Sequence, residues 1–489
     1  MCGWTRRAFV AGALALSVYG AATGAARTDP DDKDQDSDGD GGDMADGNRG
    51  PAAGPYFPDH GDPAFRATAY DLRLTYRPEA KALDARARVS GVTGRDAVGR
   101  VGLDLSSDLD VGAVRLDGAD ARFTHRRGKL WIEAARGLPP GRAFTAEVRY
   151  AGRPRPLRTP FGDIGWDYVQ GSPGGVLVAS QPLGAPSWFP CNDRPGSKAA
   201  HRIAVTVPES HQVVANGVLA DRSPAPGGAT TWTYDHRGPM ASYLATLNIG
   251  RFAFTTQGGG PVAIRNAHPA RLTEAFAHDF GRQPQMMRLF ERLFGPYPFE
   301  VYGAVVVDAV LDQPVENQTF SLFGVNHVDG RRGSEHLVAH ELAHHWFGNS
   351  VGLADWRHIW LNEGFATYCE WLWSEHGGGP TAAALAADSW SDLDDDAGRV
   401  RIGDPGPAKL FDERVYSRGA CTLHALRTTI GDDRFFAALR AWATTYRHAS
   451  AGTAEFIALA QRHAGGRDLT AFFHSWLYER RLPPLPDAP

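Results

Sequence analysis

The stretch AHELAHHW, residues 339–346, has the spacing of an amphipathic helix. His340 and His344 are four residues apart, so on a helix they lie one turn from each other on the same face. Gly348 and Asn349 follow as a predicted left-handed helix end. A second face of the helix is apolar. Its residues recur at i, i+3, i+4 and i+7: Ala339, Leu342, Ala343 and Trp346. The stretch predicts a short, packed helix that presents two imidazoles together.

A third polar group, Glu363, follows His344 after eighteen intervening residues. It lies in IWLNEGFA, residues 359–366, whose apolar pattern predicts a second helix. A buried, unpaired carboxylate is costly, and a bound metal ion removes that cost. Two histidines and one carboxylate are a frequent ligand set for zinc. We therefore expect His340, His344 and Glu363 to bind one zinc ion (Zn2+).

Glu341 is predicted to act on water rather than on the metal. Zinc with three protein ligands keeps a position for water and lowers the pKa of that water towards ~7. Glu341 lies ~100° round the helix from His340, so its carboxylate can reach the water. We expect Glu341 to be the general base and, later, the proton donor to the leaving amine. These residue types predict zinc-assisted hydrolysis.

The motifs together resemble the gluzincin aminopeptidase family, which includes aminopeptidase N and the leukotriene-type epoxide hydrolases. The centre of the resemblance is HELAH, eighteen further residues, and WLNEGFA. Three more segments are similar to motifs of that family. They are QPVEN (313–317) in place of G-x-M-E-N, VYSRGA (415–420) in place of Y-x-K-G-A, and WFPCNDRP (188–195) in place of a first-domain signature. The resemblance implies a zinc aminopeptidase.

The resemblance also implies roles for residues outside the metal set. Tyr416 matches the family's catalytic tyrosine, which holds the negative oxygen of the tetrahedral intermediate; without the resemblance it would be interpreted as a half-buried aromatic. Glu316 and Asn317 match the motif that binds the free α-amino group of a peptide, with Gln181 as a polar neighbour. Gln313 replaces the family's glycine, and a side chain there can obstruct the substrate.

The pattern along the chain predicts an α+β protein. Residues 61–258 carry short alternating strands with Gly and Pro turns, typical of an N-terminal antiparallel β-saddle or sandwich domain. Residues 259–489 are predicted to form a mainly helical zinc-peptidase domain, thermolysin-like by the resemblance. One helix is expected from Gly419 to Ile430, just after Tyr416. The 43% hydrophobic content can fill cores of this size.

The N-terminus has the pattern of an export signal. In residues 1–26, the pair Arg6-Arg7 precedes a short, alanine-rich apolar run, typical of twin-arginine signals. An uncleaved membrane anchor is the less favoured alternative, because the apolar run is short and rich in glycine and alanine. We therefore expect signal cleavage, no stable membrane insertion afterwards, and a secreted or extracytoplasmic protein.

Residues 27–60 are expected to form an acidic, disordered linker. Nine Asp and one Lys lie between residues 29 and 46, with almost no apolar groups. A calcium-loop interpretation fails at its twelfth position, Ala45. The formal net charge is −5, and no basic field indicates a nucleic-acid partner.

Several other reactive side chains are expected to be structural. His336 and His345 flank the metal motif and are interpreted as surface or packing histidines. Cys369 and Cys421 could in principle meet, but free buried thiols are the expectation for them and for Cys191.

The leading prediction is removal of N-terminal residues from peptides with a free N-terminus. Gln313 keeps open a zinc endopeptidase of the same fold. A secreted, non-catalytic binding module on a peptidase scaffold and epoxide hydrolysis are more distant alternatives. The chain ends at Pro489, where most of the family continues into a helical C-terminal domain, so we expect a more open cleft that excludes long peptides less strongly.

Overall fold

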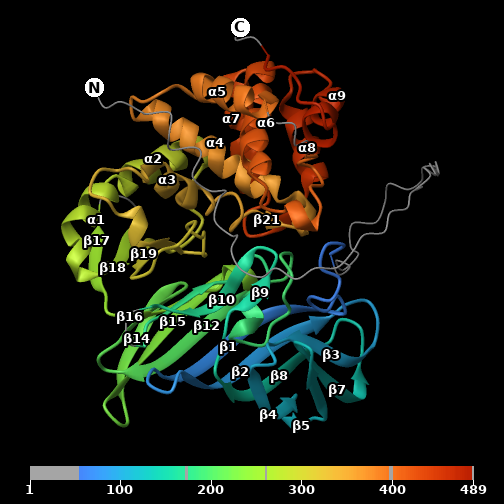
Figure 1. The fold of residues 1–489 in the computed structure, drawn as a ribbon. Coiled ribbons are helices and arrows are strands. Elements are labelled where there is room, and N and C mark those ends of the chain that lie inside the picture. The colour runs from blue at the N-terminus through green and yellow to red at the C-terminus, as the bar shows by residue number, and fades with distance from the viewer. Residues whose placement is uncertain (1–53, 171–173, 259–261, 396–399, 487–489) are drawn as a thin grey trace, which may run out of the picture. The chain divides into compact units, whose positions relative to one another are not determined.

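An eight-stranded sheet is the framework of the first part of the chain (Figure 1). The computed structural model describes residues 54–170, 174–258, 262–395 and 400–486. The strand order is β14-β15-β12-β1-β2-β8-β4-β5. The bounds are β1 Phe65–Arg77, β2 Ala82–Thr93, β4 Leu109–Leu116, β5 Ala119–Asp120, β8 Ala143–Gly152, β12 Lys198–Pro208, β14 Val218–Ala225 and β15 Ala229–Ala241.

Strand β1 illustrates how the sequence sets a buried face. Phe65 and Ala67 are buried at odd positions, whereas Tyr70 and Leu72 are buried at even positions. A β-bulge between Ala67 and Ala69 absorbs this change of parity. The pairs of this sheet are antiparallel except β1 with β12, which is parallel. The antiparallel prediction is wrong for that pair because a long crossing connection, rather than a hairpin, joins the two strands.

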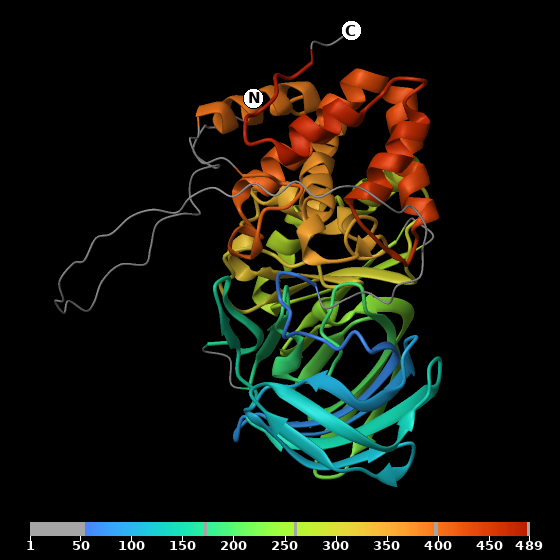
Figure 2. The ribbon, with the colours of Figure 1, turned by 90° about the vertical axis from the view of Figure 1, so that its right-hand side faces the viewer.

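Two smaller sheets lie in the same part of the chain. Their orders are β3-β7-β6 and β13-β16-β11-β10-β9. Figure 2 shows the long strands of the eight-stranded sheet running side by side, in blue to green. The bounds are β3 Val98–Asp104, β6 Phe123–Arg126, β7 Lys129–Leu138, β9 Leu157–Thr159, β10 Gly162–Tyr168, β11 Val176–Ala179, β13 Gln212–Ala215 and β16 Leu247–Gly250.

A four-stranded sheet and a set of helices form the second part, yellow-green to red in Figure 1. The sheet consists of β17 (Ala253–Gln257), β18 (Ala263–His268), β19 (Val301–Val307) and β20 (Phe320–Gly324), and its last three strands are parallel. Two short strands, β21 (Gly352–Leu353) and β22 (Ser450–Ala451), pair with each other in parallel. The helices are α1 Thr273–Asp279, α2 Gln283–Phe294, α3 Glu335–Ala343, α4 Trp360–His376, α5 Ala382–Asp395, α6 Glu413–Ile430, α7 Asp432–Thr445, α8 Thr453–His463 and α9 Thr470–Phe473.

The predicted succession of a β-rich part and a mainly helical part is confirmed. Helix α4 stops before Gly377 and α6 stops before Gly431, whose φ of 85° ends the helix as predicted. Cys191, Cys369 and Cys421 are free and buried. None of the helices in the described ranges is both long and apolar enough to cross a membrane.

The predicted signal of residues 1–26 and the calcium-like segment lie outside the described residues. Only the last residues of the predicted linker are described. Among them, the hydroxyl of Tyr56 accepts a hydrogen bond from the Gly406 N–H at 2.7 Å and donates one to Asp404.

Candidate active site

Helices α3 and α4 bring the three predicted metal ligands together. His340 lies in the last turn of α3, His344 directly follows this helix, and Glu363 lies in the first turn of α4. Oε2 of Glu363 is 3.6 Å from Nε2 of His340 and 3.4 Å from Nε2 of His344. Ligand atoms of the three residues lie within 4.8 Å of one another, and all three residues are buried. Ligands ~2.0–2.1 Å from a tetrahedral zinc are separated by about 3.4 Å, so this set fits one zinc ion.

The far nitrogen of each histidine is held by a protein acceptor. Nδ1 of His340 lies 2.6 Å from Oε1 of Glu370, and Nδ1 of His344 lies 3.1 Å from the carbonyl oxygen of Phe347. When Nδ1 carries the proton, Nε2 has its lone pair free for a metal. These contacts therefore turn both Nε2 atoms toward Glu363.

The helix carrying the histidines ends earlier than predicted. It stops at Ala343 rather than at Gly348, although Gly348 does have a positive φ of 124°. The reason is a tightened last turn, in which the N–H groups of His345 and Trp346 donate to carbonyls three residues back. His344 still has right-handed helical dihedrals, so it remains one turn above His340.

Glu341 is a buried residue beside the predicted ligand set. Its side chain is buried, and Oε2 has no hydrogen-bond partner among the described residues. Burial raises the pKa of Glu341 to about 8, although His340 and His344 act in the opposite direction. A carboxyl group with this pKa can both accept and release a proton near neutral pH.

Tyr416 is part of helix α6 and does not precede it as predicted. The helix begins at Glu413, because the side chain of Asp412 accepts the N–H of Arg414 at 3.1 Å and caps the N-terminus. The Tyr416 ring lies 6.2 Å from the His340 ring, at 22° between the planes. Burial, together with nearby carboxylates, raises the pKa of Tyr416 well above its usual value, so its hydroxyl is protonated and can donate.

Two glycines bring Tyr416 close to the ligand helix. A Cβ atom on Gly364 would lie 2.7 Å from Cα of Gly419, and a Cβ atom on Gly419 would lie 2.7 Å from Cα of Gly364. Helices α4 and α6 therefore touch backbone to backbone, directly beside Glu363 and near Tyr416.

Two of the predicted amine-binding residues, Glu316 and Asn317, lie on a loop before helix α3. Nε2 of Gln181 donates to Oε1 of Glu316 at 2.6 Å, which joins the β-rich part to this loop. The carbonyl oxygen of Glu316 accepts from Nδ2 of Asn349 at 2.7 Å. Asn317 is fully buried, and its side chain has no hydrogen-bond partner among the described residues. Gln313 is exposed.

The same loop is fixed from two sides. Thr319 has a positive φ of 76°, which is unfavourable for a β-branched residue. Its hydroxyl accepts the N–H of Gly217 at 2.8 Å, and its own N–H donates to Nε2 of His345 at 3.0 Å. His345 is thus a buried packing histidine, as expected, and burial lowers its pKa to about 3. The strained backbone of Thr319 is therefore held beside the end of helix α3, which carries His340.

Comparison with known proteins identifies the family. Residues 67–244 match the Peptidase M1 N-terminal domain, and residues 278–476 match the Peptidase family M1 domain. The crystal structure of the M1 zinc metallopeptidase from Deinococcus radiodurans is 30% identical and has a TM-score of 0.80, over 89% of this chain and 99% of that chain. This chain belongs to peptidase family M1. The resemblance to the gluzincin aminopeptidases is confirmed.

Longer M1 proteins match as well. Aminopeptidase M1-D of Oryza sativa subsp. japonica is 26% identical over 433 residues, which are 82% of this chain and 49% of that protein. Leucine aminopeptidase 2-1 of Meyerozyma guilliermondii is 28% identical over 324 residues, 62% of this chain and 51% of that protein. The chain spans about half the length of these relatives.

Sequence reasoning missed residues that shape this M1 site. Glu370 lies seven residues after Glu363, two turns further along one face of α4, and that spacing could have indicated it. His345 was expected to be structural, but its bond to Thr319 had no signal in the sequence. The contacts of Lys198 also have no signal in the sequence, because its partners are backbone oxygens far away in the chain.

Proposed function

We propose that this M1 chain is a zinc-dependent aminopeptidase that removes N-terminal residues from peptides. The observation that carries the proposal is the bond between Gln181 and Glu316 beside the ligand set. One carboxylate oxygen of Glu316 accepts from Gln181, which leaves the other for the substrate's ammonium group. A charge-assisted hydrogen bond of this kind is strongest where water is excluded, and Glu316 is buried.

The chain's own groups then divide the work of hydrolysis. Bound zinc supplies a water molecule of lowered pKa and polarises the peptide carbonyl. Glu341 takes a proton from the attacking water and passes it to the nitrogen of the leaving amine as the C–N bond breaks. The hydroxyl of Tyr416 donates a hydrogen bond to the carbonyl oxygen while that oxygen carries negative charge.

A related protein supports the substrate class. The M1 zinc metallopeptidase of Deinococcus radiodurans has been crystallised, as a mutant, with a Tyr-Ser-Ala substrate. That tripeptide has a free N-terminus, the feature that Glu316 and Gln181 would bind in this chain. For this protein the peptide substrate is our proposal.

Export is also part of the proposal, supported by Arg6-Arg7 and the short apolar run after it. Cell fractionation of the full chain and of an Arg6→Lys, Arg7→Lys variant tests it. We expect the wild-type protein outside the cytoplasm with its N-terminus removed, and the variant retained inside. Equal distribution of both proteins would overturn this assignment.

The function is tested by comparing aminoacyl reporter substrates with their N-acetylated counterparts. Loss of one charge-assisted contact to Glu316 should reduce kcat/KM on the order of 10- to 100-fold. A chelator should abolish activity, and zinc should restore it. Equal cleavage of acetylated substrates would instead indicate an endopeptidase.

The role of Glu341 is tested separately with Glu341→Gln. The variant should bind zinc as the wild type does but lose about 10²- to 10⁴-fold in kcat. Retained turnover in this variant would remove Glu341 from the proposed mechanism.

A further inference from the structure

Lys198 is a buried lysine of the β-rich part whose three side-chain hydrogen bonds all go to the helical part. It is the first residue of β12 and is only 8% exposed. Its Nζ atom donates to the carbonyl oxygens of Asn349 and Ser350, each at 2.8 Å, and of Ala449 at 2.9 Å. An ammonium group has three protons to donate, so the three carbonyls match its full capacity.

The helical part leaves room for this side chain at Gly352. A Cβ atom there would lie 2.6 Å from both Cε and Nζ of Lys198. The N–H of Gly352 also donates to the Ala449 carbonyl at 2.9 Å, so the glycine belongs to the same cluster. Any side chain at this position would displace the ammonium group.

The carbonyls that Lys198 holds are one step from the amine-binding loop. Asn349 gives its carbonyl oxygen to Lys198 and its side-chain N–H to the carbonyl oxygen of Glu316, at 2.7 Å. The N–H groups of Asn349 and Ser350 donate to the carbonyls of His344 and His345, at 2.9 and 3.1 Å. The turn held by Lys198 therefore connects the end of the metal helix to Glu316.

We infer that Lys198 is a positioning residue for recognition of the substrate's N-terminus, acting through Asn349 on Glu316. This inference rests on the proposed aminopeptidase function. It adds a second connection from the β-rich part to Glu316: Gln181 bonds directly to the carboxylate, and Lys198 is linked through Asn349 to the backbone carbonyl of Glu316.

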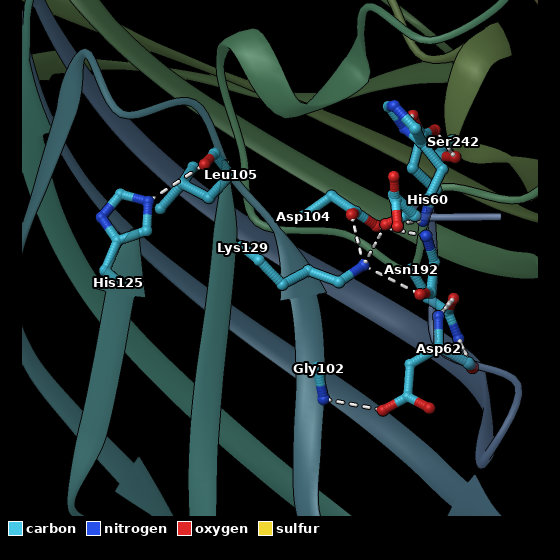
Figure 3. Close-up of polar contacts among 12 residues, drawn as sticks. His60, Asp62, Gly102, Asp104, Leu105, His125, Lys129, Asn192 and Ser242 are labelled. Carbon is cyan, nitrogen blue, oxygen red and sulfur yellow. Dashed lines mark hydrogen bonds and ion pairs between the residues drawn. The ribbon is translucent and has the colours of Figure 1, made fainter. Parts of the chain in front are cut away.

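Lys129 provides a matched comparison within the same chain. Its Nζ atom donates to Oδ1 of Asp104 at 2.6 Å (Figure 3). It also donates to the carbonyls of Gly61 and Asp59, at 2.8 and 3.0 Å. Its side chain is 15% exposed. Lys129 is thus a second lysine that binds three oxygens, but these belong to the β-rich part and not to the active site. If losing a buried lysine has only a structural effect, Lys198→Met and Lys129→Met should show that effect to a similar extent.

The test measures steady-state kinetics of four single variants and one double variant with free and N-acetylated reporters. Lys198→Met removes the ammonium group, and Gly352→Ala displaces it without removing its charge. Lys129→Met and Gly99→Ala are the controls, since nothing lies within 4 Å of a Cβ atom at Gly99. Neither Gly99 nor Gly352 has a positive φ, so alanine adds no backbone strain.

A misplaced Glu316 weakens binding in the ground state and the transition state alike, which raises KM and leaves kcat nearly unchanged. We expect both Lys198→Met and Gly352→Ala to raise KM for free-amine substrates about tenfold, with kcat within about threefold, and to retain one zinc per chain. The double variant should be no worse than Lys198→Met alone, because both changes remove the same contact.

The inference is overturned if KM stays constant while kcat falls with the folded fraction, measured by circular dichroism. It is also overturned if Lys129→Met raises KM as much as Lys198→Met does. If Lys198→Met does not fold, the result with Gly352→Ala decides. If the wild-type protein does not prefer free amines, the proposed function fails first, and the role of Lys198 fails with it.

Discussion

His340 and Glu370 form a buried pair in which Nδ1 of the imidazole lies 2.6 Å from a carboxylate oxygen. Glu370 lies on α4, the same helix that supplies the ligand Glu363. One helix therefore provides both a predicted metal ligand and the group that orients a second predicted ligand. A carboxylate behind a histidine also makes the ring more basic and a stronger metal donor.

Replacing Glu370 with Ala should lower zinc affinity by about 10- to 100-fold, the usual cost of losing a partner behind a ligand. Competition against a calibrated chelator measures this affinity. Glu375→Ala is the control, because Glu375 lies on the same helix but accepts the N–H of Ala382 at 2.9 Å. Unchanged zinc affinity in Glu370→Ala would show that the contact does not support the metal.

Tyr416→Phe removes one hydroxyl group near the His340 ring. If this hydroxyl donates only to the charged oxygen of the transition state, kcat should fall about 10²- to 10³-fold while KM changes little. Tyr368→Phe is the matched control, since Tyr368 is a buried tyrosine of α4 whose hydroxyl accepts from Arg427 at 3.3 Å. A large rise in KM for Tyr416→Phe would instead assign the hydroxyl to substrate binding.

Arg418 fixes the last part of the chain to helix α6. It is buried and donates to several backbone carbonyls, including Glu479 at 2.7 Å and Trp476 at 2.8 Å. Lysine cannot present the same planar fork, so Arg418→Lys should reduce the free energy of unfolding by about 1–3 kcal/mol.

Urea denaturation measures this loss, with Arg462→Lys as a control at an exposed position of α8. Equal midpoints for the wild type and Arg418→Lys would show that the fork geometry contributes nothing to stability.

Three buried histidines should make the fold sensitive to acid. Burial lowers the pKa of His201 to about 4, and of His236 and His345 to about 3. The unfolded chain, with histidine pKa values of about 6.5, binds protons that the folded chain does not. Their stabilising effect is therefore complete above pH ~6.5 and declines as pH falls toward ~4, by up to about 1.4 kcal/mol per pH unit for each group.

Unfolding free energies between pH 7 and pH 4 should show a shallower slope for His201→Gln than for the wild type. Comparing the two slopes cancels the contribution of the metal site, which is common to both proteins. His474→Gln should keep the wild-type slope, since the side chain of His474 is 65% exposed. A His201→Gln slope equal to that of the wild type would contradict the assignment of a neutral buried His201.

The parts of the site that sequence could predict depend on local spacing. The helical repeat alone placed His340 and His344 on one face, and an apolar pattern placed Glu363 in a second helix, because a helix fixes the positions of residues three or four apart. The start of α6 was missed because its first turn has no apolar stripe, although Asp412 is a recognisable cap.

The contacts that sequence could not predict join residues distant in the chain. Gln181 and Glu316 are 135 positions apart, and their pairing was suggested only by resemblance to a family. The contacts of Lys198 could not be predicted for a further reason. Its partners are carbonyl oxygens, which every residue carries. The parallel pairing of β1 with β12 depends on how distant strands are connected, and the residues of either strand carry no local pattern that indicates it.

The backbone contact between Gly364 and Gly419 has a consequence for redesign. Gly364 directly follows Glu363, and Gly419 lies three residues after Tyr416. One methyl group at either position would push α4 and α6 apart and move Tyr416 away from Glu363, without changing the chemical identity of any predicted ligand or proton-carrying group. The width of the space open to a peptide could therefore be adjusted at a crossing of two helices, independently of the chemistry performed there.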